Sequence, residues 1–235
     1  MKTWKGNLRL RFRATELSLC AAGIIFLPTG MLVGCEQITA GTANWAGGTI
    51  TQASSDPAEP VPGVVTTVPN HIPPLAVTFL PRPTGGGHLA MARGSDPAAP
   101  KIMLHLPDGW SSVVGTGDTA LTFSGADGMS GTVTIAETAL EPGGAFLKYA
   151  VDMRDSRPRV KFTAVAAQFC GYSSQQLAGT FQVPSGTFDF ADRLTHIWTN
   201  TKKYLVAIRL QVPAGAPGFD AAKSVLMQEF AVVIP

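Results

Sequence analysis

Hydrophobic and polar positions alternate most regularly between residues 187 and 212. Two segments, Thr187–Trp198 and Lys203–Val212, show a period of two, and residues 199–202 separate them. In the second segment Tyr204, Val206 and Ile208 fall on one face, as do the later alternate apolar positions. This pattern is typical of two neighbouring strands in an antiparallel hairpin.

Weaker patterns on either side predict more strands and two helices. Apolar residues recur at helical spacing between Pro142 and Arg157, and again from Phe219 to Val232. Turn residues bound several short apolar segments, which are expected to be strands: Ile102–Leu106, Thr119–Phe123, Gly131–Glu137, Phe162–Phe169 and Gln175–Val183. Residues 101–235 therefore predict one α+β domain with a mostly antiparallel β-sheet of six or seven strands, packed with helices.

Residues 35–100 lack a sustained period and are rich in Pro, Thr and Gly. Proline fixes φ and removes a hydrogen-bond donor, so this composition favours extended, unpaired backbone. We expect a disordered tether over 35–100, with a loop at Thr84–Pro100. A short strand at Leu75–Leu80 is the one segment of this region that can already belong to the domain.

The first 34 residues have the composition of an export signal. The chain carries 18 basic and 16 acidic residues, a formal charge of +2. Five of the basic residues precede residue 14, and Leu17–Gly34 contains no charge. A basic flank followed by a short apolar run is typical of a secretory signal peptide. The alternative, an uncleaved membrane anchor, is disfavoured because Gly23, Pro28 and Gly30 interrupt a run shorter than the ~20 residues of a spanning helix.

The end of the apolar run resembles the lipobox of bacterial lipoproteins. Leu32, Val33 and Gly34 match the residues that a signal peptidase recognises, and Cys35 matches the cysteine that receives a diacylglyceryl group. Two acyl chains are enough to hold a protein stably on a membrane. The sequence therefore predicts a signal peptide over 1–34, and a mature protein held on a membrane through acylated Cys35.

Composition and motifs exclude several function classes. Charged residues make up only 14% of the chain, which disfavours nucleic acid as a partner. None of the four histidines lies three or four residues from another, so no metal site is expected. A Gly-x-Ser-x-Gly elbow and a P-loop are absent. Asp189 and Asp192 fall on opposite faces of one predicted strand. We expect no catalytic residues and no cofactor.

Two groups of residues are candidates for binding. Trp110 at a predicted turn and Trp198 at a predicted strand end could flank a groove, since amphipathic aromatics are favoured in recognition sites; alternatively both pack against the core. Arg154, Arg157 and Arg159 belong to the one basic concentration of the mature chain. They form either a solvated helix end or a surface for an acidic lipid or glycan.

Several segments resemble the mycobacterial LpqN/LpqT lipoprotein family. The resemblance rests on Phe169–Thr180 (FCGYSSQQLAGT), the turn Pro107–Trp110, and Lys203–Val206 followed by the segment Phe219–Val232. It implies a PsbP-like α/β/α sandwich that binds partners and is not catalytic. It supplies no catalytic residue.

The expected function is that of a non-catalytic, lipid-anchored protein on the outer face of the cell membrane. Its domain would bind a partner protein or an envelope lipid or glycolipid. The alternative is an envelope hydrolase whose active site carries no known motif.

Overall fold

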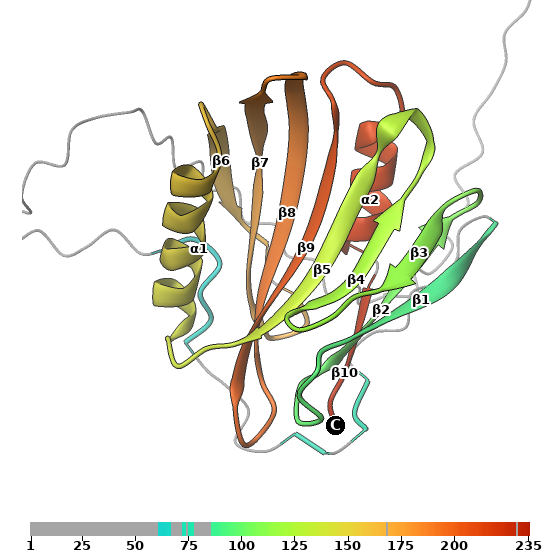
Figure 1. Ribbon diagram of the computed structural model, residues 1–235. Coiled ribbons are helices and arrows are strands. Elements are labelled where there is room, and N and C mark those ends of the chain that lie inside the picture. Colours follow the sequence, from blue (N-terminus) through green and yellow to red (C-terminus); the bar gives the residue numbers. More distant parts are fainter. Residues whose placement is uncertain (1–60, 67–71, 74, 78–85, 168, 229) are drawn as a thin grey trace, which may run out of the picture. The chain divides into compact units, whose positions relative to one another are not determined.

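Ten strands and two α-helices make up the part of the chain that the structure describes, which is residues 61–66, 72–73, 75–77, 86–167, 169–228 and 230–235 of a computed structural model (Figure 1). Seven strands form one sheet in the order β3-β4-β5-β9-β8-β7-β6, and three form a second in the order β1-β2-β10. Every pairing is antiparallel. The predicted α+β class is confirmed.

The bounds of the elements follow the chain. The strands of the large sheet are β3 (Ser111–Val114), β4 (Thr119–Ser124), β5 (Ser130–Glu137), β6 (Lys161–Ala166), β7 (Ser173–Val183), β8 (Gly186–Trp198) and β9 (Lys203–Pro213). Those of the small sheet are β1 (Gly87–Arg93), β2 (Lys101–Pro107) and β10 (Phe230–Val233). The helices are α1 (Pro142–Ser156), α2 (Phe219–Gln228) and a 3-10 turn, η1 (Ala126–Gly128).

The central strands of the large sheet are covered on both faces. Phe190 and Leu194 of β8 pack with Phe146 and Met153 of α1 in one apolar cluster. Ala191 and Ile197, on the opposite face of β8, belong to a second cluster, which also contains residues of α2 and of the small sheet. Figure 1 shows α1 and α2 on opposite sides of the sheet. This is the predicted sandwich, with helices on both faces.

The elements with the clearest periodicity are found where they are expected. The hairpin β8–β9 pairs Trp198 with Lys203, so that residues 199–202 form its turn. Helix α1 begins at Pro142, whose fixed φ suits a first helical position. It ends at Ser156, two residues before Pro158.

Three short strands were not predicted. The sequence assigns Gly87–Arg93 to a loop, yet it forms β1, because its alternating residues pair along the whole length of β2. Strand β3 has four residues and lies at the edge of the large sheet. The predicted second helix ends at Gln228, and Phe230–Val233 is a strand, β10, that pairs with β2. A four-residue apolar run is compatible with a helix or a strand, and which of them forms depends on whether a distant strand pairs with it.

The folded part of the chain extends to the N-terminal side of residue 101, where the predicted tether ends. Strand β1 lies within 35–100, and so does a segment of residues 61–66 that packs on the domain. We call residues 61–66 the entry segment. Farther along, the backbone of Ala76 accepts a hydrogen bond from Ile234 N–H at 3.1 Å, and Leu75 N–H donates to Ile234 at 3.0 Å.

The entry segment is held by hydrogen bonds to β7 and by apolar contacts. The Gly63 carbonyl accepts from Ser174 N–H at 2.9 Å, and Val65 N–H donates to the Ser173 hydroxyl at 2.8 Å. Val61 and Val64 pack against the apolar cluster beneath α1. Polar and apolar contacts together fix where the chain enters the domain.

Candidate functional site

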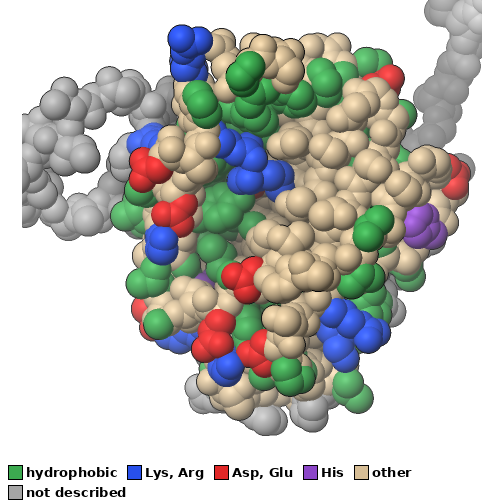
Figure 2. All heavy atoms as spheres, viewed as in Figure 1, with side chains coloured by type: hydrophobic (Ala, Val, Ile, Leu, Met, Phe, Trp, Pro, Cys, Tyr) green, Lys and Arg blue, Asp and Glu red, His purple; other side chains and the backbone are tan. Residues whose placement is uncertain are grey.

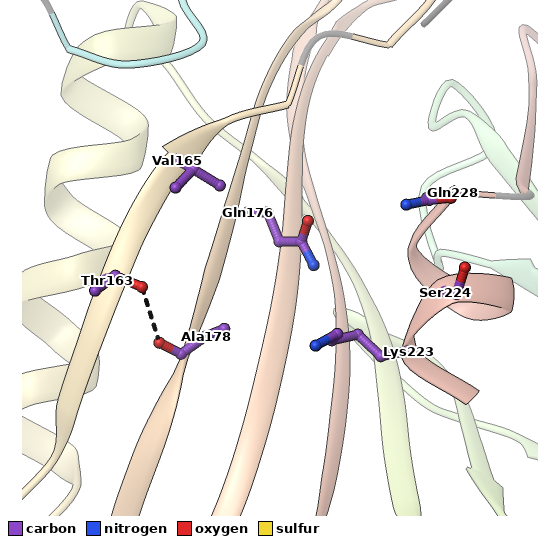
Figure 3. A pocket seen from close by; sticks show the side chains of 7 residues that line it. All are labelled: Thr163, Val165, Gln176, Ala178, Lys223, Ser224 and Gln228. Carbon is purple, nitrogen blue, oxygen red and sulfur yellow. Dashed lines mark hydrogen bonds between the residues drawn. The ribbon is translucent and has the colours of Figure 1, made fainter. Parts of the chain in front are cut away.

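A groove lies between α2 and the strands β6 and β7 at one edge of the large sheet (Figure 3). It encloses about 340 Å³, a volume at the low end of small-ligand sites. The residues that line it are Thr163 and Val165 of β6, Gln176 and Ala178 of β7, and Lys223, Ser224 and Gln228 of α2.

The groove exists because α2 does not extend over the whole face of the sheet. Helix α2 packs against β2, β8 and β9. Side chains alternate along β7, so Leu177 is buried on the α1 face while Gln176 and Ala178 point to the α2 face. Beyond the edge of α2 these last two side chains have no helix above them, and they form the floor of the groove.

The lining is polar but mostly uncharged. Gln176, Ser224 and Gln228 form no side-chain hydrogen bond with other described residues, so their amides and hydroxyl can meet a ligand. The Thr163 hydroxyl donates to the Ala178 carbonyl at 3.5 Å (Figure 3). Val165 and Ala178 add an aliphatic surface. Such a lining suits a ligand with several hydroxyl groups and a small apolar face.

Lys223 is the one titratable residue among the seven that line the groove. Its ammonium lies 2.6 Å from the Asp220 carboxylate on the preceding turn of α2, and this contact lowers the pKa of Asp220. The same ammonium lies 5.6 Å from the centre of the Phe219 ring. Lys223 is thereby held in the lining of the groove as a cation that can donate to a ligand.

The two predicted binding tryptophans lie at different ends of the sheet. Trp110 packs on Phe123, with ring centres 5.9 Å apart. Strand register places Phe123 level with Ala191 of β8. Trp198 is the last residue of β8, seven residues after Ala191 and about 23 Å further along the strand. Both side chains are half-buried against the core, and the structure does not bring them around one groove.

The three predicted arginines lie in the last turn of α1 and just beyond its end, and they differ in their surroundings. The Arg154 guanidinium lies 5.2 Å from the centre of the Phe162 ring, and Arg159 Nη1 donates to the Gln182 side chain at 2.9 Å. Arg159 also lines a second, wider hollow of about 500 Å³ beside the β7–β8 turn. Arg154 and Arg159 are exposed.

Arg157 is half-buried and covers part of the core. Its guanidinium lies 4.3 Å from the Phe181 ring centre and 5.5 Å from that of Phe190. Burial, and the neighbouring Arg209, lower its pKa. Its Nη1 atom is enclosed without a hydrogen-bond partner among the described residues. Arg157 therefore covers the apolar cluster beneath α1 and does not act mainly as a surface cation.

A polar cluster under α1 was not predicted from the sequence. Asp192 is completely buried and accepts two hydrogen bonds from Arg209, at 2.8 and 2.7 Å. Tyr149 of α1 donates to the same carboxylate at 2.8 Å. Burial, and then the charge of Asp192, raise the pKa of Tyr149 well above its usual value. The Asp192 carboxylate, the Tyr149 hydroxyl, and Nε and Nη2 of Arg209 all have hydrogen-bond partners, which is the arrangement expected of a structural site.

The remaining predictions from the sequence concern the lipobox, membrane-spanning helices and metal sites. Leu32, Val33, Gly34 and Cys35 lie outside the described residues, so the lipobox stays a prediction. No helix among the described residues is both long and apolar enough to cross a membrane. Within the same residues no group of three or more histidines, cysteines or carboxylates gathers as metal ligands would.

Comparisons with known proteins find distant structural likeness. No family model matches the chain, and no curated protein matches significantly. Among solved structures, LpqN of Mycobacterium tuberculosis, described as involved in cell envelope biogenesis, aligns with a TM-score of 0.49 and 15% identity, over 63% of this chain and 91% of that one. PA94 of Pseudomonas aeruginosa, a protein of unknown function, aligns with a TM-score of 0.35 and 12% identity, over 58% and 91%. Membership of the LpqN/LpqT family stays a prediction.

Proposed function

We propose that this protein is a lipid-anchored, non-catalytic protein of the cell envelope, and that the groove between β6–β7 and α2 binds a hydroxyl-rich envelope component such as a glycan or the sugar headgroup of a glycolipid. The observation that carries the binding role is the lining of that groove. It offers two amides, two hydroxyls and one ammonium beside the small aliphatic surface of Val165 and Ala178.

The chemistry of the lining favours recognition over catalysis. A hydrolytic site needs a nucleophile or an acid–base pair held at hydrogen-bond distance. The groove presents one ammonium, engaged with Asp220, and neutral hydrogen-bonding groups. Amides and hydroxyls that lack protein partners are suited to pair with sugar hydroxyls, since each can both donate and accept.

Lipid anchoring rests on the sequence. Cys35 follows Leu32, Val33 and Gly34 at the end of an uncharged run, where lipoproteins carry their acylated cysteine. Replacement of the thiol by Cys35→Ala should leave unprocessed precursor or release the protein from the membrane fraction. A processed Cys35→Ala protein that stays membrane-bound would show that the anchor is something else.

A photo-crosslinking amino acid at position 176, in the full-length chain in its native envelope, tests the groove. We expect adducts with a glycan or glycolipid, and their loss in the variant Ala178→Phe, which fills the groove floor. The matched control is Val113→Phe, a similar change at an exposed position of β3. Adducts that persist in Ala178→Phe would exclude the groove, and protein adducts alone would assign it to a protein partner.

A further inference from the structure

The outer face of α1 carries an exposed apolar stripe. Leu147 and Val151, one helical turn apart, are 52% and 46% exposed, and Leu140, just before the helix, is 39% exposed. Residues four apart lie on the same face of a helix. Leu140 approaches the same surface, since a Cβ placed on Gly144 would lie 3.7 Å from its Cβ atom. We call Leu140, Leu147 and Val151 the α1 stripe.

The entry segment brings the chain onto the domain beside this stripe. Val61 packs below the first turn of α1, where its Cγ2 atom would lie 3.5 Å from a Cβ on Gly143. Figure 1 shows the segment running alongside α1. The N-terminal part of the chain, with the predicted lipid site at Cys35, therefore joins the domain on the α1 side of the sheet.

The length of chain before Val61 limits how the domain can stand on a membrane. From Cys35 to Val61 even a fully extended backbone spans at most about 90 Å. The predicted tether runs over residues 35–100, but its residues 61–66 are bound to the domain. The residues between Cys35 and Val61 therefore set how far the domain can lie from the lipid. As the predicted random coil, the same stretch would span roughly 30 Å, so a lipid at Cys35 keeps the start of α1 closer to the bilayer, on average, than the far side of the sheet.

The charge around the stripe suits an anionic surface. Residues 148–161 contain five basic side chains and two acidic ones. Lys148 is paired with Asp152 at 2.8 Å, while Arg154, Arg159 and Lys161 are exposed at and beyond the end of the helix. Basic residues close to an anionic leaflet are attracted to it within a Debye length. Figure 2 shows hydrophobic, basic and acidic side chains side by side along this edge of the molecule.

We infer that the α1 stripe lies on the lipid surface to which the protein is anchored, with the exposed cations Arg154, Arg159 and Lys161 at the headgroups. An amphipathic helix with apolar residues on one face and cations beside them is suited to this position. The inference rests on the proposed lipid anchor. It also predicts that the groove opens on the side of the domain away from the lipid, because Gln176 and Ala178 lie on the opposite face of the sheet from α1.

Quenching of a fluorophore by lipids tests this orientation. The full-length protein, with a coumarin-bearing amino acid at position 147, is reconstituted in phosphatidylcholine–phosphatidylglycerol vesicles that contain lipids with nitroxides near the headgroup. The control label is at position 113, also exposed (68%), on β3. Four strand spacings separate β3 from β8, about 19 Å. We expect several-fold stronger quenching at 147 than at 113, and a loss of this difference in Val151→Asp.

Three outcomes overturn the inference. Equal quenching at the two positions, or stronger quenching at 113, would place another face on the lipid. A label at 147 that becomes shielded without nitroxide contact would show that a second copy or another protein covers the stripe.

The anchor is tested separately from the orientation. A protein made in cells that carries no lipid on Cys35 would contradict the proposed anchoring. In that case Cys35 of a chain with Cys20→Ala and Cys170→Ala is coupled to a maleimide phospholipid, and the quenching comparison is still made. Failure of the orientation with the anchor present would contradict the α1 stripe alone.

Discussion

Asp192 and Arg209 face each other directly across the β8–β9 hairpin, and the guanidinium binds the buried carboxylate through two hydrogen bonds of 2.8 and 2.7 Å. Tyr149 ties α1 to the same pair, because its hydroxyl donates to Asp192 and accepts from Arg209. The pair therefore joins the helix to the two central strands of the sheet.

Removing the charge of Asp192 should destabilise the protein strongly. Asp192→Asn leaves the partly buried Arg209 without its counter-ion, and the loss of one partner of a buried pair typically costs about 3–5 kcal/mol. Urea unfolding followed by circular dichroism measures this change. Asp189→Asn is the matched control: Asp189 lies on the opposite face, accepts one hydrogen bond from Gly215 N–H at 3.3 Å, and should cost about 1 kcal/mol or less. Equal losses in the two variants would contradict a stabilising role of the Asp192–Arg209 pair.

The pairing of these residues could have been predicted, but their burial could not. Once residues 199–202 are assigned to the turn, the two-residue period of the strands places position 192 opposite position 209. Nothing local to β8 or β9 indicates that α1 lies above this point. The contact with Tyr149 depends on how the helix packs, which joins residues 43 positions apart.

The groove and the short strands were missed for the same reason. Local periodicity identifies β8, β9 and α1 because each is long enough to show its period. Strands β1, β3 and β10 are short or are held by a distant partner, as Phe230 is by Leu104 of β2. The groove depends on where the edge of α2 falls over the sheet. The sequence around Val165 and Gln176 does not indicate where that edge falls.

All three tyrosines of the chain should resist ionisation in the folded state. Burial is the main cause that raises the pKa of Tyr172 and of Tyr204 to about 12, and it also raises the pKa of Tyr149 well above its usual value. Because the folded-state pKa exceeds the unfolded value near 10, the tyrosines favour folding below pH 10, and this contribution is lost as the pH rises above that value.

Ultraviolet titration at alkaline pH measures this directly. The native protein should show almost no tyrosinate absorbance at a pH where the urea-unfolded chain shows half of it or more. Tyr149→Phe should reduce the alkaline loss of stability, because it removes one of the three groups that ionise only on unfolding. Native titration near pH 10 for two or more tyrosines would contradict their burial.

A network around Asp96 should make the protein sensitive to acid. The Asp96 carboxylate accepts hydrogen bonds from Lys202 at 2.7 Å, from Ala98 N–H at 2.9 Å and from Tyr204 at 2.8 Å. Lys202 is the largest influence among those that lower the pKa of Asp96 to about 2. Since the folded-state pKa lies below the unfolded value of 3.8, this stabilisation is complete above about pH 4 and is lost as the pH falls towards 2.

Urea midpoints measured from pH 5 to pH 2 test the Asp96 network. Asp96→Asn should flatten the profile over the acid range, because the side chain no longer titrates. Lys202→Met should have a similar effect, since it removes the main partner of the carboxylate. Profiles that keep the slope of the unmodified protein in both variants would show that other carboxyl groups dominate its acid response.

The entry segment should depend on the absence of a side chain at Gly63. This glycine has φ +80°, and a Cβ at this position would overlap the carbonyl oxygen of Ser174. Gly63→Ala should therefore detach residues 61–66 from β7, which limited proteolysis reports as new cleavage within that segment. Gly171→Ala is the matched control, because Gly171 has nearly the same φ, +81°, but nothing lies within 4 Å of a Cβ there. It should cost about 1 kcal/mol of backbone strain and leave the segment protected. Detachment should also weaken the quenching difference between positions 147 and 113, because the chain would then join the domain farther from α1. Cleavage at 61–66 that is equal in the two variants would show that the contact with Ser174 does not hold the segment in place.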